Sequence, residues 1–129
     1  MSLMVLIINT LSYMAKNKGE LFDKELQVRA SMFKALGHPA RLAILKYLAE
    51  IKTCICGDIS DELPLSRTTV NQHLKELKKA GLISGTVAGV KTNYCINPAR
   101  VEWLEENLSS FVREIKTDPD SVKVENDCC

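Results

Sequence analysis

Apolar residues recur at helical spacing in the middle of the chain, where Val70, Leu74 and Leu77 fall on one face. Ser66 before them is a favourable N-cap residue, and Gly81 after them can adopt the left-handed conformation that ends many helices. The pattern predicts an amphipathic helix between Ser66 and Gly81, with one apolar face for a core and one face left for a partner.

The free face of this helix is polar in a particular order. Short side chains stand near its start and lysines follow toward its end, whereas a merely solvated helix more often alternates Glu with Lys. Short polar groups suit the edges of DNA bases and cations suit phosphates, so the pattern favours a DNA recognition helix over an ordinary surface helix. The face contains Arg67, Thr68, Asn71, Gln72, Lys75 and Lys78.

The neighbouring segments complete a winged helix-turn-helix. Two strand-like runs, Leu82–Val87 and Lys91–Ile96, are separated by Ala-Gly-Val and predict a β-hairpin directly behind the helix. Upstream, Gly57–Leu63 predicts one short helix that Pro64 ends, followed by a turn of the length found in helix-turn-helix motifs. We expect DNA contacts from Ser66, Arg67, Thr68, Thr69, Asn71, Gln72 and Lys75 on the helix and from Lys91 in the hairpin.

Two further apolar stripes bracket these elements, one between Glu20 and Leu36 and one after Pro98. They predict two amphipathic helices, which either form a dimer interface or complete a monomeric core. A palindromic DNA site requires the symmetry that a dimer provides, and this favours the interface. The stripes are Phe22, Leu26, Ala30, Phe33 and Leu36, and Val101, Leu104, Leu108, Phe111, Val112 and Ile115.

Together these segments resemble the ArsR/SmtB family of metal-responsive repressors. The resemblance covers roughly Ser31 to Ile96 and rests on Phe33–Leu45, Gly57–Ile59 and Val70–Leu77, which stand at matching spacing. It implies a mainly α fold with a small β-wing, and a homodimer through the terminal helices that binds an inverted-repeat operator in double-stranded DNA. It also implies release of that operator when a metal or metalloid ion binds thiolates or imidazoles.

The composition fits a small DNA-binding domain. The 129 residues have the length of one domain, and the formal net charge is +1. The charges are segregated, because cations dominate between Ser66 and Gly81 while the helix after Pro98 is acidic. No paired carboxylates, Ser/His/Asp set or phosphate-binding loop appears outside the features already explained, so we do not expect an enzyme.

We divide the chain into an N-terminal arm (1–19), a winged helix-turn-helix and dimerisation domain (20–115) and a polar tail (116–129) that we expect to be disordered. The apolar run Leu3–Ile8 is too short to span a membrane and lacks the features of a signal peptide. We therefore expect a cytoplasmic protein without a membrane partner. The arm either packs on the dimer or lies upstream of a native start at Met14.

The five cysteines suggest an effector site, because an odd number without signs of secretion favours free thiols. Cys54 and Cys56 flank Ile55 in a strand-like run, which points both side chains to one side. In winged helices this first strand pairs with the last wing strand, which here contains Cys95, so three thiolates can meet if the register agrees. We expect a site at Cys54, Cys56 and Cys95 for As(III) or Sb(III), with Cd(II), Pb(II) or Zn(II) behind them.

A disulfide redox switch and a structural role remain alternatives for these three cysteines. Cys128 and Cys129 are adjacent in the tail, where we expect only accessory or adventitious binding. Many family members place the second cysteine of a Cys-x-Cys pair directly before an aspartate, but Gly57 takes that place here. One residue reverses the face of a strand, so the family's usual site is not carried over. The family's other common site needs histidines that the helix after Pro98 lacks.

His38 and His73 are assigned to capping and packing rather than to metal ligation. Arg41 stands near the start of a helix, where it can hold a phosphate or pair equally well with Asp58 or Asp61. Two rival functions remain at this point: a thiol-based redox-sensing repressor of the same fold, and a protein-binding winged helix without DNA activity.

Overall fold

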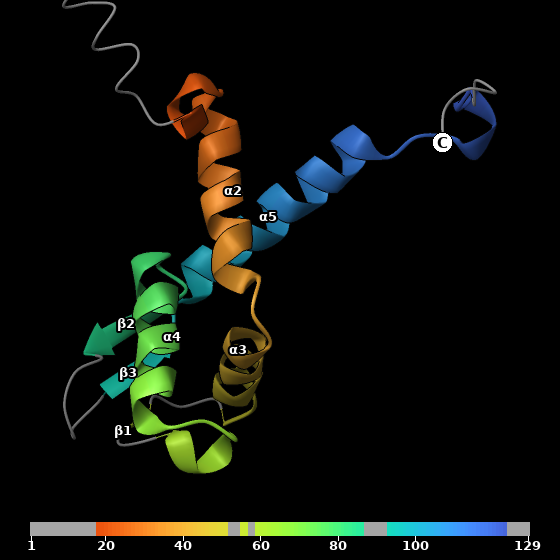
Figure 1. Cartoon of the computed structure of the whole chain (residues 1–129). Coiled ribbons are helices and arrows are strands. Elements are labelled where there is room, and N and C mark those ends of the chain that lie inside the picture. The colour runs from red at the N-terminus through yellow and green to blue at the C-terminus, as the bar shows by residue number, and fades with distance from the viewer. Residues whose placement is uncertain (1–17, 52–54, 57–58, 87–92, 124–129) are drawn as a thin grey trace, which may run out of the picture.

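The computed structural model describes residues 18–51, 55–56, 59–86 and 93–123 of the chain. It is mainly helical with a small sheet, which confirms the predicted winged helix-turn-helix (Figure 1). Within these ranges, no helix is both long and apolar enough to cross a membrane. The elements, with η for 3-10 helix, are η1 (Lys18–Leu21), α2 (Lys24–Leu36), α3 (Pro39–Ile51), β1 (Ile55–Cys56), η2 (Ser60–Glu62), α4 (Arg67–Lys79), β2 (Ile83–Thr86), β3 (Asn93–Ile96), α5 (Pro98–Ile115) and η3 (Pro119–Ser121).

The core lies where α3, α4 and the sheet pack together. Tyr94 of β3 and Ile44 of α3 are completely buried, and Leu74 of α4 is 1% exposed. Removing each such side chain from water contributes roughly 1.5 to 3 kcal/mol, so these contacts fix α4 on the rest of the domain. The buried cluster contains Met32, Ile44, Leu48, Ile59, Val70, Leu74, Leu77, Leu82, Ile83 and Tyr94.

The sheet has the strand order β1-β3-β2, and both of its pairs are antiparallel. β2 and β3 form the predicted hairpin, with Ser84 opposite Cys95. β1 pairs with the other edge of β3, as the sequence predicts, and places Cys56 opposite Asn93. The segment between β2 and β3, which includes Lys91, lies outside the described residues.

The first helix of the helix-turn-helix is shorter than predicted. The sequence predicts a helix over Gly57–Leu63, whereas the described residues form a single 3-10 turn over Ser60–Glu62. Leu63 is extended, with φ −127° and ψ 145°, because the ring of Pro64 disfavours the helical conformation of the preceding residue. Ile59 is only 2% exposed and anchors the turn in the core.

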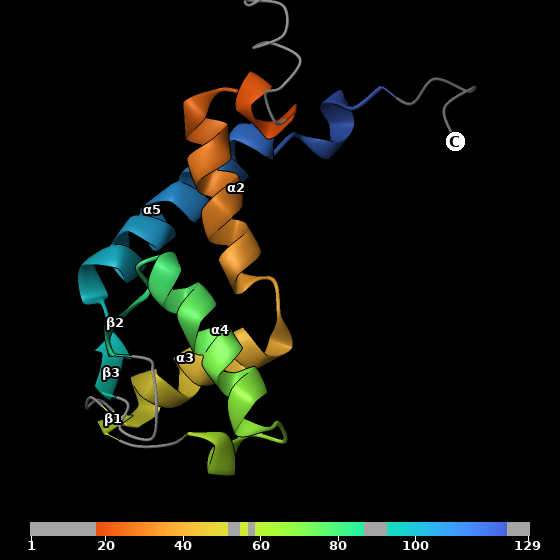
Figure 2. The same ribbon diagram turned by 60° about the vertical axis from the view of Figure 1, so that its left-hand side comes forward.

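The helices α2 and α5 cross beside the body formed by α3, α4 and the sheet (Figures 1 and 2). Phe33 of α2 packs against Phe111 of α5, with the ring centroids 5.7 Å apart. Phe33, Leu36 and Leu104 of the two predicted apolar stripes pack against the core, but most of the stripe residues stay exposed. Their exposed members are Phe22, Leu26, Ala30, Val101, Leu108, Val112 and Ile115.

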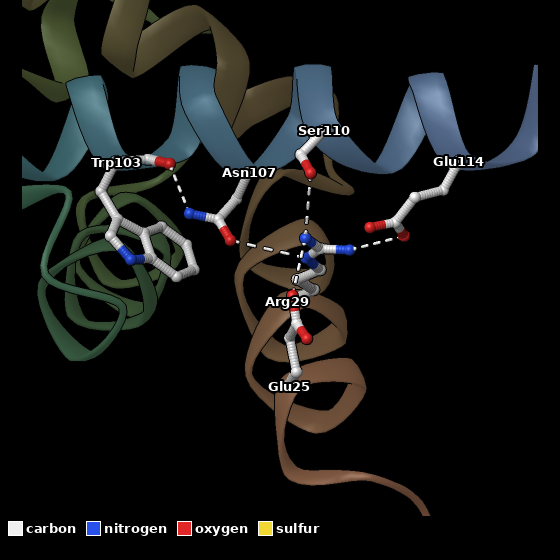
Figure 3. A network of polar contacts seen from close by, with 6 residues as sticks. All are labelled: Glu25, Arg29, Trp103, Asn107, Ser110 and Glu114. Atoms are coloured by element: carbon white, nitrogen blue, oxygen red, sulfur yellow. Dashed lines mark hydrogen bonds and ion pairs between the residues drawn. The ribbon is translucent and has the colours of Figure 1, made fainter.

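Arg29 joins the two crossing helices through a polar network (Figure 3). It is only 6% exposed, and its guanidinium pairs with Glu25 at 2.8 Å and with Glu114 at 2.9 Å. It also donates hydrogen bonds to Asn107 Oδ1 at 3.5 Å and Ser110 Oγ at 3.4 Å. Because a buried charge is costly unless its partners are in place, the network favours one arrangement of α2 against α5.

The tail differs from its predicted disorder over a few residues. Pro119–Ser121 forms a 3-10 turn, and the Asp118 carboxylate accepts a hydrogen bond from the N–H of Asp120 at 3.1 Å. An aspartate cap followed by proline favours such a turn, so the prediction is wrong for this segment.

Gly85 of β2 occupies a position where a larger residue would be strained. Its φ is +114°, and a Cβ atom at this position would lie 1.9 Å from the carbonyl oxygen of Asn93. Gly85→Ala should therefore lower the free energy of unfolding, measured in urea, by at least about 2 kcal/mol. Gly37→Ala is the control, because Gly37 has φ −77° and its Cβ would meet the nearest atom at 3.3 Å. Equal losses for the two variants would contradict the strain assigned to Gly85.

Candidate nucleic-acid interface

The helix α4 begins with a side-chain cap. Ser66 is extended, with φ −67° and ψ 155°, and its Oγ accepts a hydrogen bond from the N–H of Thr69 at 3.3 Å. The Ser66 hydroxyl also donates to Thr69 Oγ1 at 3.0 Å. The predicted capping role of Ser66 is confirmed, and any DNA contact of these two hydroxyls has to coexist with the cap.

Three buried residues set the direction of α4. Val70, Leu74 and Leu77 are each at most 1% exposed, so the opposite face of the helix is directed at solvent. An α-helix fits the major groove of DNA, and this face carries the groups suited to bases and phosphates. Exposed on it are Arg67, Thr68, Gln72, Lys75 and Lys78, while Thr69 and Asn71 are partly buried.

The end of α4 is fixed by the backbone and by α5. Gly81 has φ +81°, and the N–H of Leu82 donates to the carbonyl of Leu77 at 3.0 Å, as in a Schellman motif. The predicted glycine stop is thus confirmed. Arg100 of α5 adds a contact that the sequence pattern does not reveal, because its Nε donates to the carbonyl of Ala80 at 3.1 Å.

Two histidines join the start of α3 to the middle of α4. The rings of His38 and His73 have centroids 4.2 Å apart, and His38 Nδ1 accepts a hydrogen bond from the N–H of Ala40 at 3.0 Å. Burial lowers the pKa of His73, and the charges on His38 and Arg41 lower it further. The Glu76 carboxylate raises the same pKa. Both histidines therefore have the packing and capping roles that the sequence predicts.

Arg41 contacts the backbone of α2. Its Nη2 donates to the carbonyl of Lys34 at 3.4 Å. None of the ion pairs among the described residues joins it to Asp61, and Asp58 lies outside the described ranges. The Nε of Arg41 is buried and has no hydrogen-bond partner in the described part of the chain. The alternative of an ion pair with Asp61 is thus not found among the described residues.

The predicted thiol site is described only in part. Cys95 is a partly buried free thiol whose Sγ lies 3.8 Å from Ser84 Oγ. Because Cys56 is paired with Asn93, its register position is diagonal to that of Cys95. Cys54 lies outside the described residues. In the described ranges, no three His, Cys, Asp or Glu side chains are grouped to hold a metal ion.

Comparison with known proteins identifies the family. Residues 36–86 match a family model described as a helix-turn-helix domain. The arsenical resistance operon repressor of Bacillus subtilis is 33% identical over 118 residues, which cover 90% of this chain and all of that repressor (100%). The chain belongs to the ArsR/SmtB family. It is a helix-turn-helix transcriptional regulator and not an enzyme.

Two further transcriptional regulators are similar to this chain. An uncharacterized HTH-type transcriptional regulator of Methanocaldococcus jannaschii is 45% identical over 74 residues, which cover 57% of this chain and 82% of the relative. An ArsR-like transcriptional regulator from Rhodococcus sp. RHA1 is 26% identical, with a TM-score of 0.53 over 67% of this chain and 81% of that one. Both matches are to transcriptional regulators, and the match in fold is to an ArsR-like one.

Arg29 and Arg100 position helices of this ArsR/SmtB fold, although neither is among the predicted site residues. A weak signal for Arg29 exists, since Glu25 precedes it by four residues and such pairs are common on helix surfaces. Its burial depends on α5 residues 78 to 85 positions away, and helical periodicity carries no information about contacts at that separation.

Gln72→Ala should weaken binding to the specific operator by about 1 to 3 kcal/mol and binding to random DNA much less, because an amide reads base edges. Lys75→Ala should weaken binding to all DNA and reduce the salt slope by about one unit, because every sequence presents the same phosphates. Fluorescence anisotropy on both DNAs at several salt concentrations measures the two effects. Lys116→Ala, at the exposed end of α5, controls for the loss of one positive charge. Equal losses on specific and random DNA for Gln72→Ala would contradict its assignment.

Proposed function

We propose that the chain is a cytoplasmic, homodimeric repressor that reads an inverted-repeat operator with α4. It releases the operator when As(III) or Sb(III) binds cysteine thiolates, with Cd(II), Pb(II) and Zn(II) as the next candidates. The observation that supports DNA reading is the outward polar face of α4, whose direction follows from the burial of Val70, Leu74 and Leu77. The proposed contacts are Ser66, Arg67, Thr68, Thr69, Asn71, Gln72, Lys75 and Lys91.

The apolar face of α2 and α5 supports a second copy of the chain as the partner. Phe22 is 64% exposed and Ile115 is 59% exposed, and an open hollow of about 480 Å³ lies beside Leu26 and Phe111. Large exposed apolar areas mark interaction surfaces. A twofold-symmetric operator needs a twofold-symmetric reader, with its recognition helices about 34 Å apart in successive major grooves. One partner copy would cover the apolar face and supply the second α4.

Leu108→Asp should convert the dimer to a monomer that no longer holds the operator, because the charge would be buried in the subunit interface. Sedimentation equilibrium should give twice the chain mass of 14.4 kDa for the unmodified protein and the single mass for the variant. Thr117→Asp adds the same charge beyond the end of α5 and should remain dimeric. Circular dichroism checks folding, and Val112→Lys replaces Leu108→Asp if that variant unfolds. An unmodified protein that is monomeric would overturn the proposed dimer.

The effector site is proposed at Cys54, Cys56 and Cys95. In support, Cys95 is a free thiol, and the pairing of β1 with β3 makes Cys56 its diagonal neighbour in the register. Such diagonal positions are about 7 to 8 Å apart at their Cα atoms, and thiolates bind soft ions. β1 precedes the helix-turn-helix directly, so an ion that joins β1 to β3 would bias the placement of α4. Coupling of this kind amounts to about 1 to 3 kcal/mol, or roughly 5- to 150-fold in operator affinity.

Cys54→Ser, Cys56→Ser and Cys95→Ser should each retain operator binding and lose release by arsenite, since the site needs all three thiolates. X-ray absorption on the arsenic-loaded protein should find three sulfur ligands at one arsenic per subunit. The double variant Cys128→Ser, Cys129→Ser is the control and should respond as the unmodified protein does. A response lost only in this control would move the sensor to the tail. Release by mild oxidant with a disulfide at Cys95, and by no ion, would replace the metal site with a redox switch.

A further inference from the structure

A small pocket lies between α2, α3 and α4, on the side of α4 that meets the other helices. Its volume is about 150 Å³, which exceeds the roughly 30 Å³ that one water occupies and is enough for a small ion and its first waters. Three different helices contribute polar side chains to its wall. These are Ser31 and Lys34 from α2, Arg41 from α3, and Glu76 and Lys79 from α4.

One group at this pocket lacks a partner. The Nε of Arg41 is buried and makes no hydrogen bond within the described part of the chain, although Nη2 of the same guanidinium donates to the carbonyl of Lys34. A buried donor without a partner destabilises the fold, and a charged donor does so more strongly. An acceptor in the pocket would remove this cost once a shift of the Arg41 side chain brings the inaccessible Nε to it.

The charges around the pocket are mostly positive. Lys34, Arg41 and Lys79 face one acidic residue, Glu76, and the ion pairs recorded in the described ranges all belong to Arg29 instead. A neighbouring hollow shares Ser31 and Lys79 and adds Lys24 and Arg100, and the described residues of its wall include no acidic one. In a chain with a net charge of only +1, this is a local excess of cations.

We propose that the pocket binds a phosphate group. Phosphate oxygens match the forked donors of a guanidinium, and lysines add point charges that need no fixed geometry. Arg41 supplies its guanidinium, whose Nε–H has no hydrogen-bond partner in the described part of the chain, Lys34 and Lys79 supply charge, and Ser31 supplies a hydroxyl. A bound phosphate would connect α2 to the C-terminal half of the recognition helix.

The phosphate has two possible sources, a free phosphate-class anion or the DNA backbone. The residues named at this site include no cysteine, and phosphate binding is measured without the proposed effector, so its test is separate from that of the thiol site. Isothermal titration of inorganic phosphate into the DNA-free full chain, at constant ionic strength in a non-phosphate buffer, measures the first source. Operator and random-DNA affinities in the same buffer measure the second source.

Arg41→Lys keeps the charge and removes the Nε–H, and it should weaken phosphate binding about tenfold or more. Lys79→Gln changes an exposed residue and should weaken binding without affecting the fold. Lys46→Gln removes an exposed cation of α3 outside the pocket and should leave binding unchanged.

Phosphate binding that weakens in both pocket variants and not in the control would support a free anion. Absence of free binding, with Lys79→Gln weakening all DNA binding and reducing the salt slope by about one unit, would support the DNA backbone as the source. The proposal is overturned if phosphate binds equally to all variants, or if neither free phosphate nor DNA binding changes in the pocket variants.

Discussion

The burial of three side chains of α4 is the constraint on which the proposed DNA-reading geometry depends. Val70, Leu74 and Leu77 are essentially inaccessible to water, and each contributes roughly 1.5 to 3 kcal/mol through the hydrophobic effect. A folded domain is stable by only about 5 to 15 kcal/mol, so a rotation of α4 that exposed these residues would consume much of its stability. The polar face is therefore held outward by the core, and the exposed side chains need only be chemically suited to DNA.

The crossing of α2 and α5 follows a different principle. Its buried centre is the charged Arg29 with acceptors from both helices, while apolar residues such as Phe22 and Ile115 remain outside. A polar network gives little net stability but penalises alternative arrangements, because each would leave a buried charge unpaired. An interface of this kind fixes the angle between the two helices, and the apolar faces remain available to a partner. Because a charged residue is buried at the crossing and apolar residues lie outside it, α2 and α5 add few apolar side chains to the core of the single chain.

Elements with strong local signals are predicted correctly from the sequence. The N-cap at Ser66, the left-handed stop at Gly81 and the hairpin of β2 and β3 all follow from residue type and spacing. The helix predicted over Gly57–Leu63 is found in the described residues only as the 3-10 turn Ser60–Glu62, because Pro64 already makes Leu63 extended.

Features that depend on distant contacts are not predictable in this way. The buried Arg29, the contact of His38 with His73 and the bond from Arg100 to α4 each join residues far apart in the chain. A hydrophobic pattern locates a face of a helix, but it does not identify the element that covers that face. The same limit applies to the thiol site, where the sequence predicts the pairing of β1 with β3 and the register decides which positions face each other.

Other elements of the fold adjoin both ends of the proposed recognition helix α4. Its start follows η2 and β1, and its end is bonded to Arg100 and lies beside the pocket of Arg41 and Lys79. A helix of 13 residues is about 20 Å long and behaves as a rigid rod, so a small displacement at either end moves the whole polar face. Close packing around Leu74 and Leu77 resists gradual deformation and favours discrete positions of α4. A ligand at β1 and a ligand at the pocket would then act on the same equilibrium from opposite ends, and each would alter the affinity for the other through DNA-competent placement of α4.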